Sequence, residues 1–371
     1  MIKKKILQVS CEGLGNGGVQ AVIMGICTQL SNDFIFDILL FTNEVRYYDE
    51  TFLNFGGNIY RFSKNDYFVS KILSRLYFLI KLPFVTYRLL KNHGPYIAIH
   101  CHNYFEGGLC CLGAYFAGVP VRICHSHSVA NYDRNWKDKI YSFILKPFVN
   151  IFSNVKIGCS SQAVNYLFYD YSKSIVINNG IDLKKFSPKR FSDAEKKPLS
   201  FIHIGQYSPI KNQAFLLDVF KNIHDKFPKA TLDMMGFGQD ETKIRKKIIQ
   251  LNLENCVSLH RNDEDRAALF ARSKYMIFPS KFEGFGIVLI EAQAMGVECF
   301  ASDTIPRTTN VGLCWYLDLN KGIASWSYYI IEHINRCKKF KVNQKKLNDF
   351  NVEKISSFYN DIYLNGDISL L

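Results

Sequence analysis

The sequence predicts an α/β protein made of two doubly wound parallel sheets that face each other across a cleft. Its 371 residues are more than a single hydrophobic core usually organises, so two domains are expected. Short apolar segments alternate with helical patterns, as they do in parallel sheets that are covered by helices. This alternation pauses at residues 178–198, which are polar and contain two prolines, and then resumes.

Ten apolar segments are expected to be strands, five in each domain. The predicted domains are residues 1–178 and 179–345, and an amphipathic C-terminal segment, 346–371, could pack back on the first domain. Because ligands bind at the carboxyl ends of parallel strands, functional residues should follow the strands directly. The expected strands span residues 4–10, 36–42, 96–102, 119–128 and 154–161, and then 199–206, 230–238, 256–261, 275–280 and 297–302.

The composition restricts the expected partners and compartment. A formal charge of +13 favours anionic partners such as phosphorylated small molecules or an anionic membrane face. The 11 cysteines are scattered and form no C-x-x-C pair, which indicates a reducing cytoplasm. We find no pattern of a secretory leader, no apolar run of about 18 residues and no nucleic-acid motif. A cytoplasmic protein without a nucleic-acid partner is therefore expected.

The stretch FPSKFEGFGIVLIEAQAMG, residues 278–296, carries the strongest functional signal. An expected strand ends there, a loop presents Glu283, and a helix continues through Glu291. Backbone N–H groups at the start of such a helix favour an anion such as a diphosphate. Carboxylates beside it can accept hydrogen bonds from sugar hydroxyls, so the pattern predicts a sugar-nucleotide site. Lys211, which follows an earlier strand, can reach the diphosphate as a point charge.

At these residues the chain resembles the GT-B glycosyltransferases of family 4. The matching segments of the second half are NNGID, GQYSPIKN, MGFG, residues 278–296 and ASD. In the first half, GNGGVQAVI and RICHSHS are similar to the family's glycine loop and histidine loop on the acceptor side. The resemblance implies two Rossmann-like domains, and it extends to a subgroup that builds bacterial capsular and exopolysaccharide repeat units.

The resemblance implies the roles of the donor-side residues. Glu283 would contact the donor sugar, Glu291 the ribose hydroxyls, and Lys211 the diphosphate that leaves. The family usually has arginine where Gln206 stands, so one diphosphate cation is missing, and Arg307 stands where the family often has glutamate. The family needs no bound metal and no cofactor. The other implied donor contacts are Gly284, Phe285, Gly286, Gly205, Gln206, Arg261 and Gly236.

The glycine loop after the first strand has two interpretations. Gly13, Gly15 and Gly18 fit the G-x-G-x-x-G pattern of dinucleotide sites, and Glu44 ends the second strand. In the glycosyltransferase interpretation, Gly17 and Gly18 let the backbone approach a phosphate or the acceptor. We favour the latter, because a dehydrogenase has no use for the paired carboxylates of the second domain.

Two short histidine motifs follow strands of the first domain. By the resemblance, His127, or otherwise His125, faces the transferred sugar. The motifs HCH (100–102) and HSH (125–127) each place two histidines on one side of a strand, which could seed a zinc site. No carboxylate stands at a motif spacing, so polar strand ends beside the cleft are favoured and no metal is expected.

Residues 60–92 mix basic, aromatic and aliphatic side chains at helical spacing. Such a helix suits the headgroup layer of an anionic membrane, where an enzyme would meet a lipid-linked acceptor. An ordinary amphipathic helix packed on the first sheet fits the pattern equally well.

The sequence therefore predicts a retaining glycosyltransferase of the hexosyltransferase class. It would move a sugar from a nucleotide donor, expected to be UDP-linked, to a glycan acceptor, expected to be lipid-linked, at the inner face of the cell membrane. A UDP-sugar 2-epimerase of the same fold is the nearest alternative and would need no acceptor. An NAD-dependent oxidoreductase and a non-catalytic membrane scaffold are more distant alternatives.

Overall fold

The computed structural model contains two compact units. The first comprises Met1–Gly180 and Val352–Leu371, and the second comprises Ile181–Asn351. The sequence had placed these divisions after residues 178 and 345. The residues whose structure is described are 3–63, 70–102, 104–127, 136–191, 196–261, 264–336 and 338–366.

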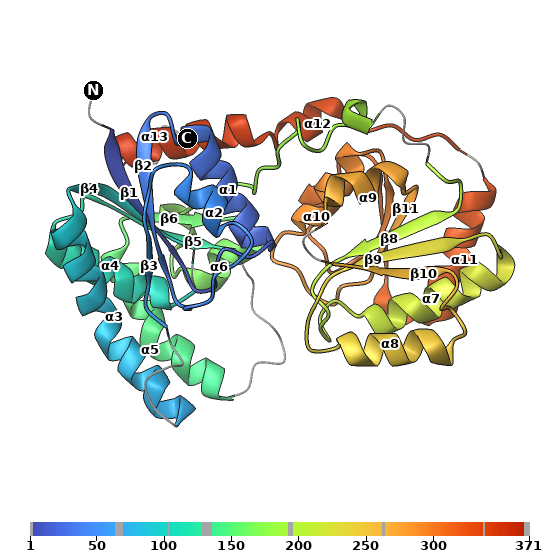
Figure 1. Cartoon of the computed structure of the whole chain (residues 1–371), viewed down its shortest axis with the longest axis horizontal. Coiled ribbons are helices and arrows are strands. Elements are labelled where there is room, and N and C mark those ends of the chain that lie inside the picture. Colours follow the sequence, from blue (N-terminus) through green and yellow to red (C-terminus); the bar gives the residue numbers. More distant parts are fainter. Residues whose placement is uncertain are drawn as a thin grey trace. The chain divides into compact units, whose positions relative to one another are not determined.

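The first unit is built on a seven-stranded sheet whose neighbouring strands are parallel, in the order β3-β2-β1-β4-β5-β6-β7. The two doubly wound sheets predicted from the alternating pattern are confirmed (Figure 1). The short strands β3 and β7 were missed because two or three residues carry no readable alternation. The strands are β1 (Lys4–Ser10), β2 (Phe34–Leu40), β3 (Ile59–Arg61), β4 (Tyr96–Cys101), β5 (Val121–Ser126), β6 (Val155–Gly158) and β7 (Ile175–Val176).

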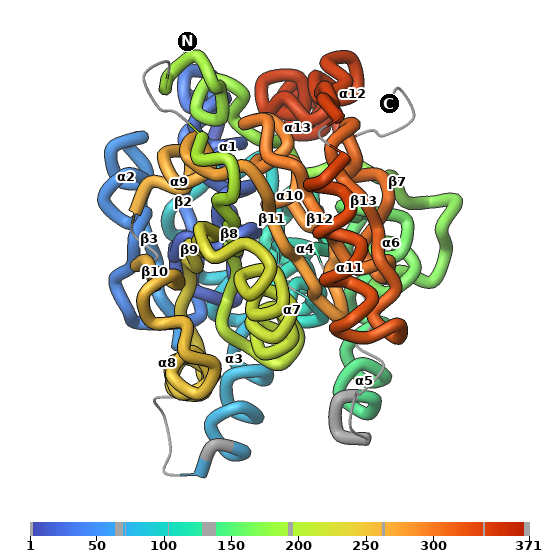
Figure 2. Tube along the Cα trace, turned by 90° about the vertical axis from the view of Figure 1, so that its right-hand side faces the viewer, coloured from blue at the N-terminus to red at the C-terminus, as the bar shows by residue number. Residues whose placement is uncertain are grey.

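Helices cover both faces of this sheet. α3, α4 and α5 pack together on one face, and α1 and α13 pack together on the other (Figures 1 and 2). The last helix of the chain therefore belongs to the first unit. The helices are α1 (Gly18–Leu30), α2 (Asp49–Leu53), α3 (Lys71–His93), α4 (Glu106–Ala117), α5 (Trp136–Phe152), α6 (Ser161–Leu167) and α13 (Val352–Asn365).

The period of two along β4 separates a core face from a polar face. Ile99 and Cys101 join the hydrophobic core under α3, α4 and α5. His100 points the other way and is hydrogen-bonded to Tyr363 of α13. A buried strand with polar side chains on one face is unusual, because a buried polar group is costly unless it is paired.

Glycines set the spacing of the helices on the core face. A Cβ on Gly113 of α4 would lie 2.3 Å from the Pro83 carbonyl oxygen of α3. A Cβ on Gly108 would lie 2.3 Å from the Val149 backbone nitrogen of α5. α3 and α5 therefore approach α4 to backbone contact, which fixes the positions of their outer faces.

The second unit is a six-stranded sheet whose paired strands are parallel, in the order β10-β9-β8-β11-β12-β13. Five of these strands were expected, and β13 was not. The strands are β8 (Ser200–Ile204), β9 (Thr231–Met235), β10 (Val257–His260), β11 (Tyr275–Phe278), β12 (Glu298–Ser302) and β13 (Cys314–Leu317), and the helices are α7 (Gln213–Lys226), α8 (Glu241–Gln250), α9 (Arg266–Arg272), α10 (Ile287–Ala294), α11 (Gly322–Asn335) and α12 (Gln344–Asn348).

The basic, aromatic segment at 60–92 differs from the single helical pattern expected of it. Its first residues belong to β3, residues 64–69 lie outside the described residues, and α3 begins at Lys71 and continues through Pro83. Within the described part of the chain, no helix has both the length and the hydropathy needed to cross a membrane.

The tight contact at Gly113 predicts a large effect from a single methyl group. We expect Gly113→Ala to lower the free energy of unfolding by about 1–3 kcal/mol, because the added Cβ meets backbone that cannot rotate away. Urea denaturation followed by circular dichroism measures this change.

Gly15→Ala is the matched control, because an added Cβ there would have its nearest neighbour at 3.8 Å. Equal stability of the two variants would show that α3 and α4 are not in backbone contact at Gly113.

Candidate active site

The second unit brings two sequence motifs together at the carboxyl edge of its sheet. The loop after β8 carries Lys211, and the loop after β11 carries Glu283. The Lys281 backbone N–H donates to the Ile210 carbonyl at 2.8 Å, and the Asn212 side chain donates to the Pro279 carbonyl at 3.3 Å. The two loops therefore form one surface although they are some 70 residues apart in the chain.

Lys211 and Glu283 form a direct ion pair across these loops. Both side chains are partly buried, and the Lys211 ammonium also lies 5.4 Å from the centre of the Phe278 ring. Two residues singled out independently in the sequence are thus placed in contact. A partly buried cation next to a carboxylate can serve a ligand that carries both phosphate and hydroxyl groups.

The turn into α10 depends on a glycine. Gly286 precedes the helix and has φ +86°, a backbone conformation that residues other than glycine rarely adopt. The adjacent Phe285 is buried and packs against Phe350. Gly236, predicted to contact the donor, lies where a Cβ would be 2.1 Å from the Gly205 carbonyl oxygen, so close packing requires glycine there.

Glu291 lies in the second turn of α10, a helix whose residues are all buried. Its residue is 2% exposed, and its Oε2 lies 3.3 Å from Nη1 of Arg266. Burial raises the pKa of Glu291, and the charges of Arg266 and Lys185 oppose that shift. Oε2 accepts no hydrogen bond from any group that the structure describes, so this buried oxygen can accept a hydrogen bond from a ligand.

Arg266 was not identified from the sequence. It is buried at the start of α9, and nothing in the local pattern distinguishes it from a surface arginine. Arg261, predicted to contact the donor, is exposed just after β10. Gln206 is exposed after β8, and its carbonyl accepts a hydrogen bond from the buried Gln213 side chain at 2.9 Å.

In the first unit, the predicted glycine loop lies next to a small pocket. Gly17 caps α1 and Gly18 begins it. Glu44, the candidate ribose ligand of a dinucleotide site, is instead paired with Arg46 at 2.5 Å. The pocket encloses about 80 Å³ and is lined by Ser10, Cys11, Glu12, Val19, Gln20, His102, Tyr104, Ser126 and His127.

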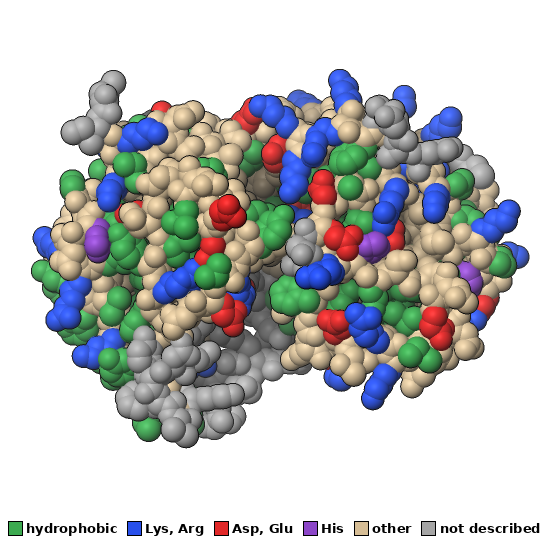
Figure 3. Space-filling view, in the orientation of Figure 1, with side chains coloured by type: hydrophobic (Ala, Val, Ile, Leu, Met, Phe, Trp, Pro, Cys, Tyr) green, Lys and Arg blue, Asp and Glu red, His purple; other side chains and the backbone are tan. Residues whose placement is uncertain are grey.

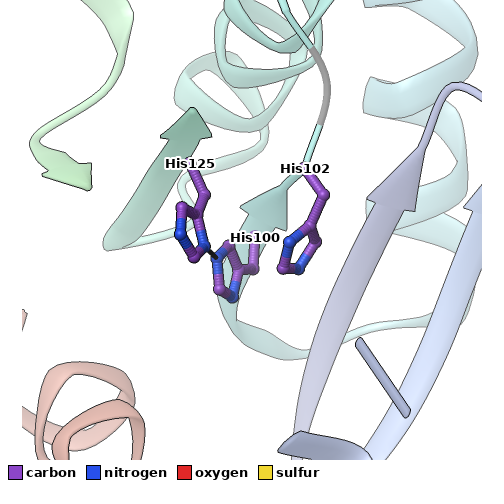
Figure 4. Close-up of side chains that lie close together, drawn as sticks. All are labelled: His100, His102 and His125. Atoms are coloured by element: carbon purple, nitrogen blue, oxygen red, sulfur yellow. Dashed lines mark hydrogen bonds between the residues drawn. The ribbon is translucent and has the colours of Figure 1, made fainter. Parts of the chain in front are cut away.

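Four histidines lie together on the polar face of β4 and β5, at the carboxyl ends of these strands. Figure 4 shows His100, His102 and His125 side by side. His100 Nε2 is 3.2 Å from His125 Nδ1, and His102 Nδ1 is 2.9 Å from His127 Nε2. These are hydrogen-bond distances, so one proton is shared within each pair.

Gln8 of β1 and Tyr363 of α13 connect the two histidine pairs. The Gln8 side-chain nitrogen donates to the Tyr363 hydroxyl at 3.0 Å, and the Gln8 oxygen is 2.8 Å from His102 Nε2. The Tyr363 hydroxyl is also 2.8 Å from His100 Nδ1. Neither Gln8 nor Tyr363 was identified from the sequence, because each stands alone in an apolar or amphipathic pattern.

Burial keeps these rings neutral. It lowers the pKa of His100, His102 and His125 well below the ordinary value of a histidine, and each ring is close to other histidines that strengthen the shift. Burial lowers the pKa of His127 to about 3, and the Asn179 side chain opposes this shift.

One nitrogen of each of His100, His102 and His125 lies within 4.8 Å of the others, a spacing that a metal ion could also bridge. In this structure both ring nitrogens of His100 and of His102, and Nδ1 of His125, are in hydrogen bonds with other side chains.

Several bacterial proteins resemble the chain over most of its length. EpsF of Bacillus subtilis (strain 168), assigned to the glycosyltransferases, is 29% identical over 88% of this chain and 86% of its own. CapH of Staphylococcus aureus, a capsular polysaccharide biosynthesis glycosyltransferase, is 27% identical over 73% and 78%. An N-acetylgalactosaminyltransferase of Campylobacter jejuni, whose name specifies a saccharide-diphospho-undecaprenol acceptor, is 25% identical over 80% of each chain.

A solved structure has the same fold. The crystal structure of Anabaena Alr3699/HepE in complex with UDP and glucose superposes with a TM-score of 0.75 and 17% identity. The match covers 98% of this chain and 100% of the other.

Two family models match consecutive parts of the chain. Glycosyltransferase Family 4 matches residues 16–185, and Glycosyl transferases group 1 matches residues 185–311. These segments contain Gly17 and Gly18 of the glycine loop, the four histidines, Lys211, Glu283 and Glu291. The chain is an enzyme that belongs to the family 4 glycosyltransferases of the GT-B fold.

Proposed function

We propose that this enzyme transfers a sugar from UDP to a lipid-linked saccharide, with retention of anomeric configuration, during synthesis of a bacterial surface polysaccharide. The contact between Lys211 and Glu283 in the loop before α10, together with the buried acceptor Glu291 on that helix, is the observation that carries the proposal. The name of CapH supports the polysaccharide part of the proposal, and the name of the Campylobacter transferase supports the class of acceptor.

The donor side follows from charge and hydrogen bonding in the second unit. Glu291 accepts hydrogen bonds from the ribose hydroxyls at Oε2, which is paired with Arg266 but accepts no hydrogen bond from the described residues. Glu283 accepts from a hydroxyl of the donor sugar. Lys211 and the backbone N–H groups at the start of α10 hold the diphosphate. UDP is the nucleotide named for the Anabaena structure, and it is the first to test.

Catalysis by these residues is mainly electrostatic. Negative charge grows on the diphosphate as the bond to the sugar breaks, and a cation already in place stabilises that charge without reorganisation. Lys211 supplies this cation where Gln206 replaces the family's arginine. In the first unit, His127 meets hydroxyls of the transferred sugar, and Gly17 and Gly18 allow close approach of the acceptor. The residues need no metal or cofactor for this step.

A lipid-linked acceptor requires the enzyme to meet a membrane surface, and α3 and α5 offer one. On α3, Ile72 is 78% exposed and Phe84 is 62% exposed; on α5, Phe143 is 82% exposed. The Arg75 guanidinium lies 4.2 Å from the centre of the Tyr141 ring, so the two helices are in contact. We call this face of α3 and α5 the apolar ridge; its other exposed members are Leu73, Leu76, Ile80, Tyr87, Ile140 and Ile144.

Basic side chains accompany the apolar ridge, as an anionic membrane requires. Lys81, Arg88 and Lys91 are exposed on α3. Figure 3 shows Lys and Arg side chains beside hydrophobic ones over this helix, at the lower left. Apolar groups that enter the headgroup layer and cations that meet its phosphates act together in such a helix.

The ribose assignment predicts the effect of one carboxylate on nucleotide affinity. We expect Glu291→Ala to weaken UDP binding roughly 10- to 100-fold, because hydrogen bonds to a charged acceptor are lost. Calorimetric titration of the purified protein with UDP, and with GDP and NAD for comparison, measures the change.

Glu298→Gln is the matched control, since Glu298 is also little exposed but stands at the start of β12, away from the carboxyl edge of the sheet, and pairs with His333. Unchanged UDP affinity in Glu291→Ala would refute the ribose assignment. Binding of NAD without UDP would refute the proposed donor class.

The apolar ridge and the basic side chains beside it predict membrane binding that depends on both apolar and basic residues. We expect Ile80→Glu and Phe84→Glu each to weaken sedimentation with phosphatidylglycerol vesicles roughly tenfold or more, because burying such a side chain contributes about 1.5–3 kcal/mol. Lys81→Glu with Arg88→Glu should also weaken it, and the wild-type protein should bind neutral vesicles less tightly.

Ile249→Glu provides the control for adding one negative charge at an exposed apolar position, because Ile249 is 59% exposed on α8 of the second unit. If the α3 variants sediment like the wild type, the ridge does not contact the membrane.

A further inference from the structure

A single line of hydrogen bonds runs through six side chains of the first unit. Its order is His125, His100, Tyr363, Gln8, His102 and His127, and each link is between 2.8 and 3.2 Å. The line ends at His125 Nε2 and His127 Nδ1. Both atoms are buried, and neither makes a hydrogen bond of good geometry with a residue that the structure describes, although the Asn179 side chain lies close enough to His127 to oppose the fall of its pKa. Two buried ring nitrogens without partners point to a ligand.

The positions of the protons follow from the Gln8 amide. Its nitrogen donates to Tyr363, so the Tyr363 hydroxyl donates to His100 Nδ1. The neutral His100 ring then carries its proton on Nε2 and donates it to His125 Nδ1, which leaves His125 with an N–H at Nε2.

The other branch ends in the opposite way. The Gln8 oxygen accepts the His102 Nε2 proton, so His102 Nδ1 is bare and accepts from His127 Nε2. His127 Nδ1 is therefore a bare acceptor. In this arrangement all four rings carry the proton on Nε2, and the line ends in one donor, at His125, and one acceptor, at His127.

If the Gln8 side-chain amide is rotated by 180°, so that its oxygen and nitrogen exchange places, every hydrogen bond in the line reverses its direction. All four protons move to Nδ1, His125 becomes the acceptor and His127 the donor. A single amide supplies one donor and one acceptor, so the two ends remain opposite in either arrangement.

We propose that Gln8 and Tyr363 are positioning residues that hold His125 and His127 in opposite hydrogen-bonding states, so that His127 accepts a hydrogen bond from a substrate hydroxyl. This role rests on the proposed function, in which His127 meets the transferred sugar. His127 lines the pocket beside Glu12 and Gln20, where such a hydroxyl can enter. A cationic ring has no bare nitrogen to accept with, and burial keeps this one neutral.

The test is to observe the tautomers of the free protein by ¹⁵N–¹H spectroscopy with labelled histidine. We expect His100, His102, His125 and His127 to share one tautomer, with the proton on Nε2. Mixed tautomers among the four rings would overturn the proposal, and so would four protons on Nδ1, because His127 would then be a donor. The exposed His93 provides an internal reference for a ring outside the line.

Gln8→Glu gives the sharpest second measurement. A carboxylate only accepts, so it must take protons from both His102 and Tyr363. The His102–His127 pair should keep its protons on Nε2, whereas the His100–His125 pair should move them to Nδ1. If the two pairs respond alike, Gln8 does not connect them.

Gln8→Leu removes the hydrogen bonds that connect the two histidine pairs, so both pairs should show mixed tautomers. The KM for the sugar donor or for the acceptor should rise about tenfold, which corresponds to the loss of one hydrogen bond. His93→Gln should leave tautomers and KM unchanged. If Gln8→Leu does not fold, the spectra of the wild-type protein and of Gln8→Glu still test whether Gln8 connects the two histidine pairs.

Two further measurements distinguish this inference from metal binding by the histidines and from a failure of the proposed function. Spectra with EDTA and with one equivalent of Zn²⁺ should coincide; a shift confined to His100, His102 and His125 would show metal ligation and overturn the proposal. UDP binding is measured independently of these spectra. Loss of UDP binding with the expected tautomers contradicts the proposed function alone, and mixed tautomers with intact UDP binding contradict this inference alone.

Discussion

The hydrogen bonds of the Tyr363 hydroxyl join the last helix of the chain to the centre of the first sheet. Gln8 and Tyr363 are separated by 355 positions in the sequence, yet their side chains are 3.0 Å apart and buried. α13 covers the polar face of β4 and β5, and its Tyr363 hydroxyl is the partner of both the buried Gln8 amide and His100. An unpaired buried polar group costs about 1–3 kcal/mol, so the first unit depends on residues that follow the second unit in the chain.

This dependence explains why the first unit is discontinuous. Its first 180 residues supply the complete sheet, and the residues after Asn351 supply α13, which covers one face of the sheet together with α1. Tyr359 and Tyr363 pack their rings against His100, with ring centres 5.4 and 5.9 Å away. The same contacts that bury the histidines also keep them neutral. Packing and the chemistry of the candidate site are therefore not separable in this unit.

Five of the six strands of the second unit, and the positions of its charged residues after these strands, were predictable because their signals are local. A buried strand is a continuous apolar segment, and Glu283, Gly286 and Glu291 stand within one short motif. Arg266 and Gln8 were missed for the opposite reason. Each acquires its role from a partner distant in the sequence, and an arginine at a helix start or a glutamine in a strand has many ordinary explanations. A usable signal did exist in the first unit, because Gln8, His100 and His102 all fall on the polar side of buried strands.

The candidate sites of the two units differ in their electrostatics. The second unit places charges at the edge of its sheet: Lys211 with Glu283, and Arg266 with the buried Glu291. Charge suits a diphosphate, whose own charge grows during transfer. The first unit presents neutral rings, because four histidines buried in contact cannot all carry charge. Neutral rings suit sugar hydroxyls, which need a defined donor or acceptor and gain little from a net charge. A glycosyl donor contains both a charged diphosphate and neutral sugar hydroxyls. A protein with a charged site in one unit and a neutral hydrogen-bonding site in the other can therefore recognise the diphosphate by charge and the hydroxyls by hydrogen bonds.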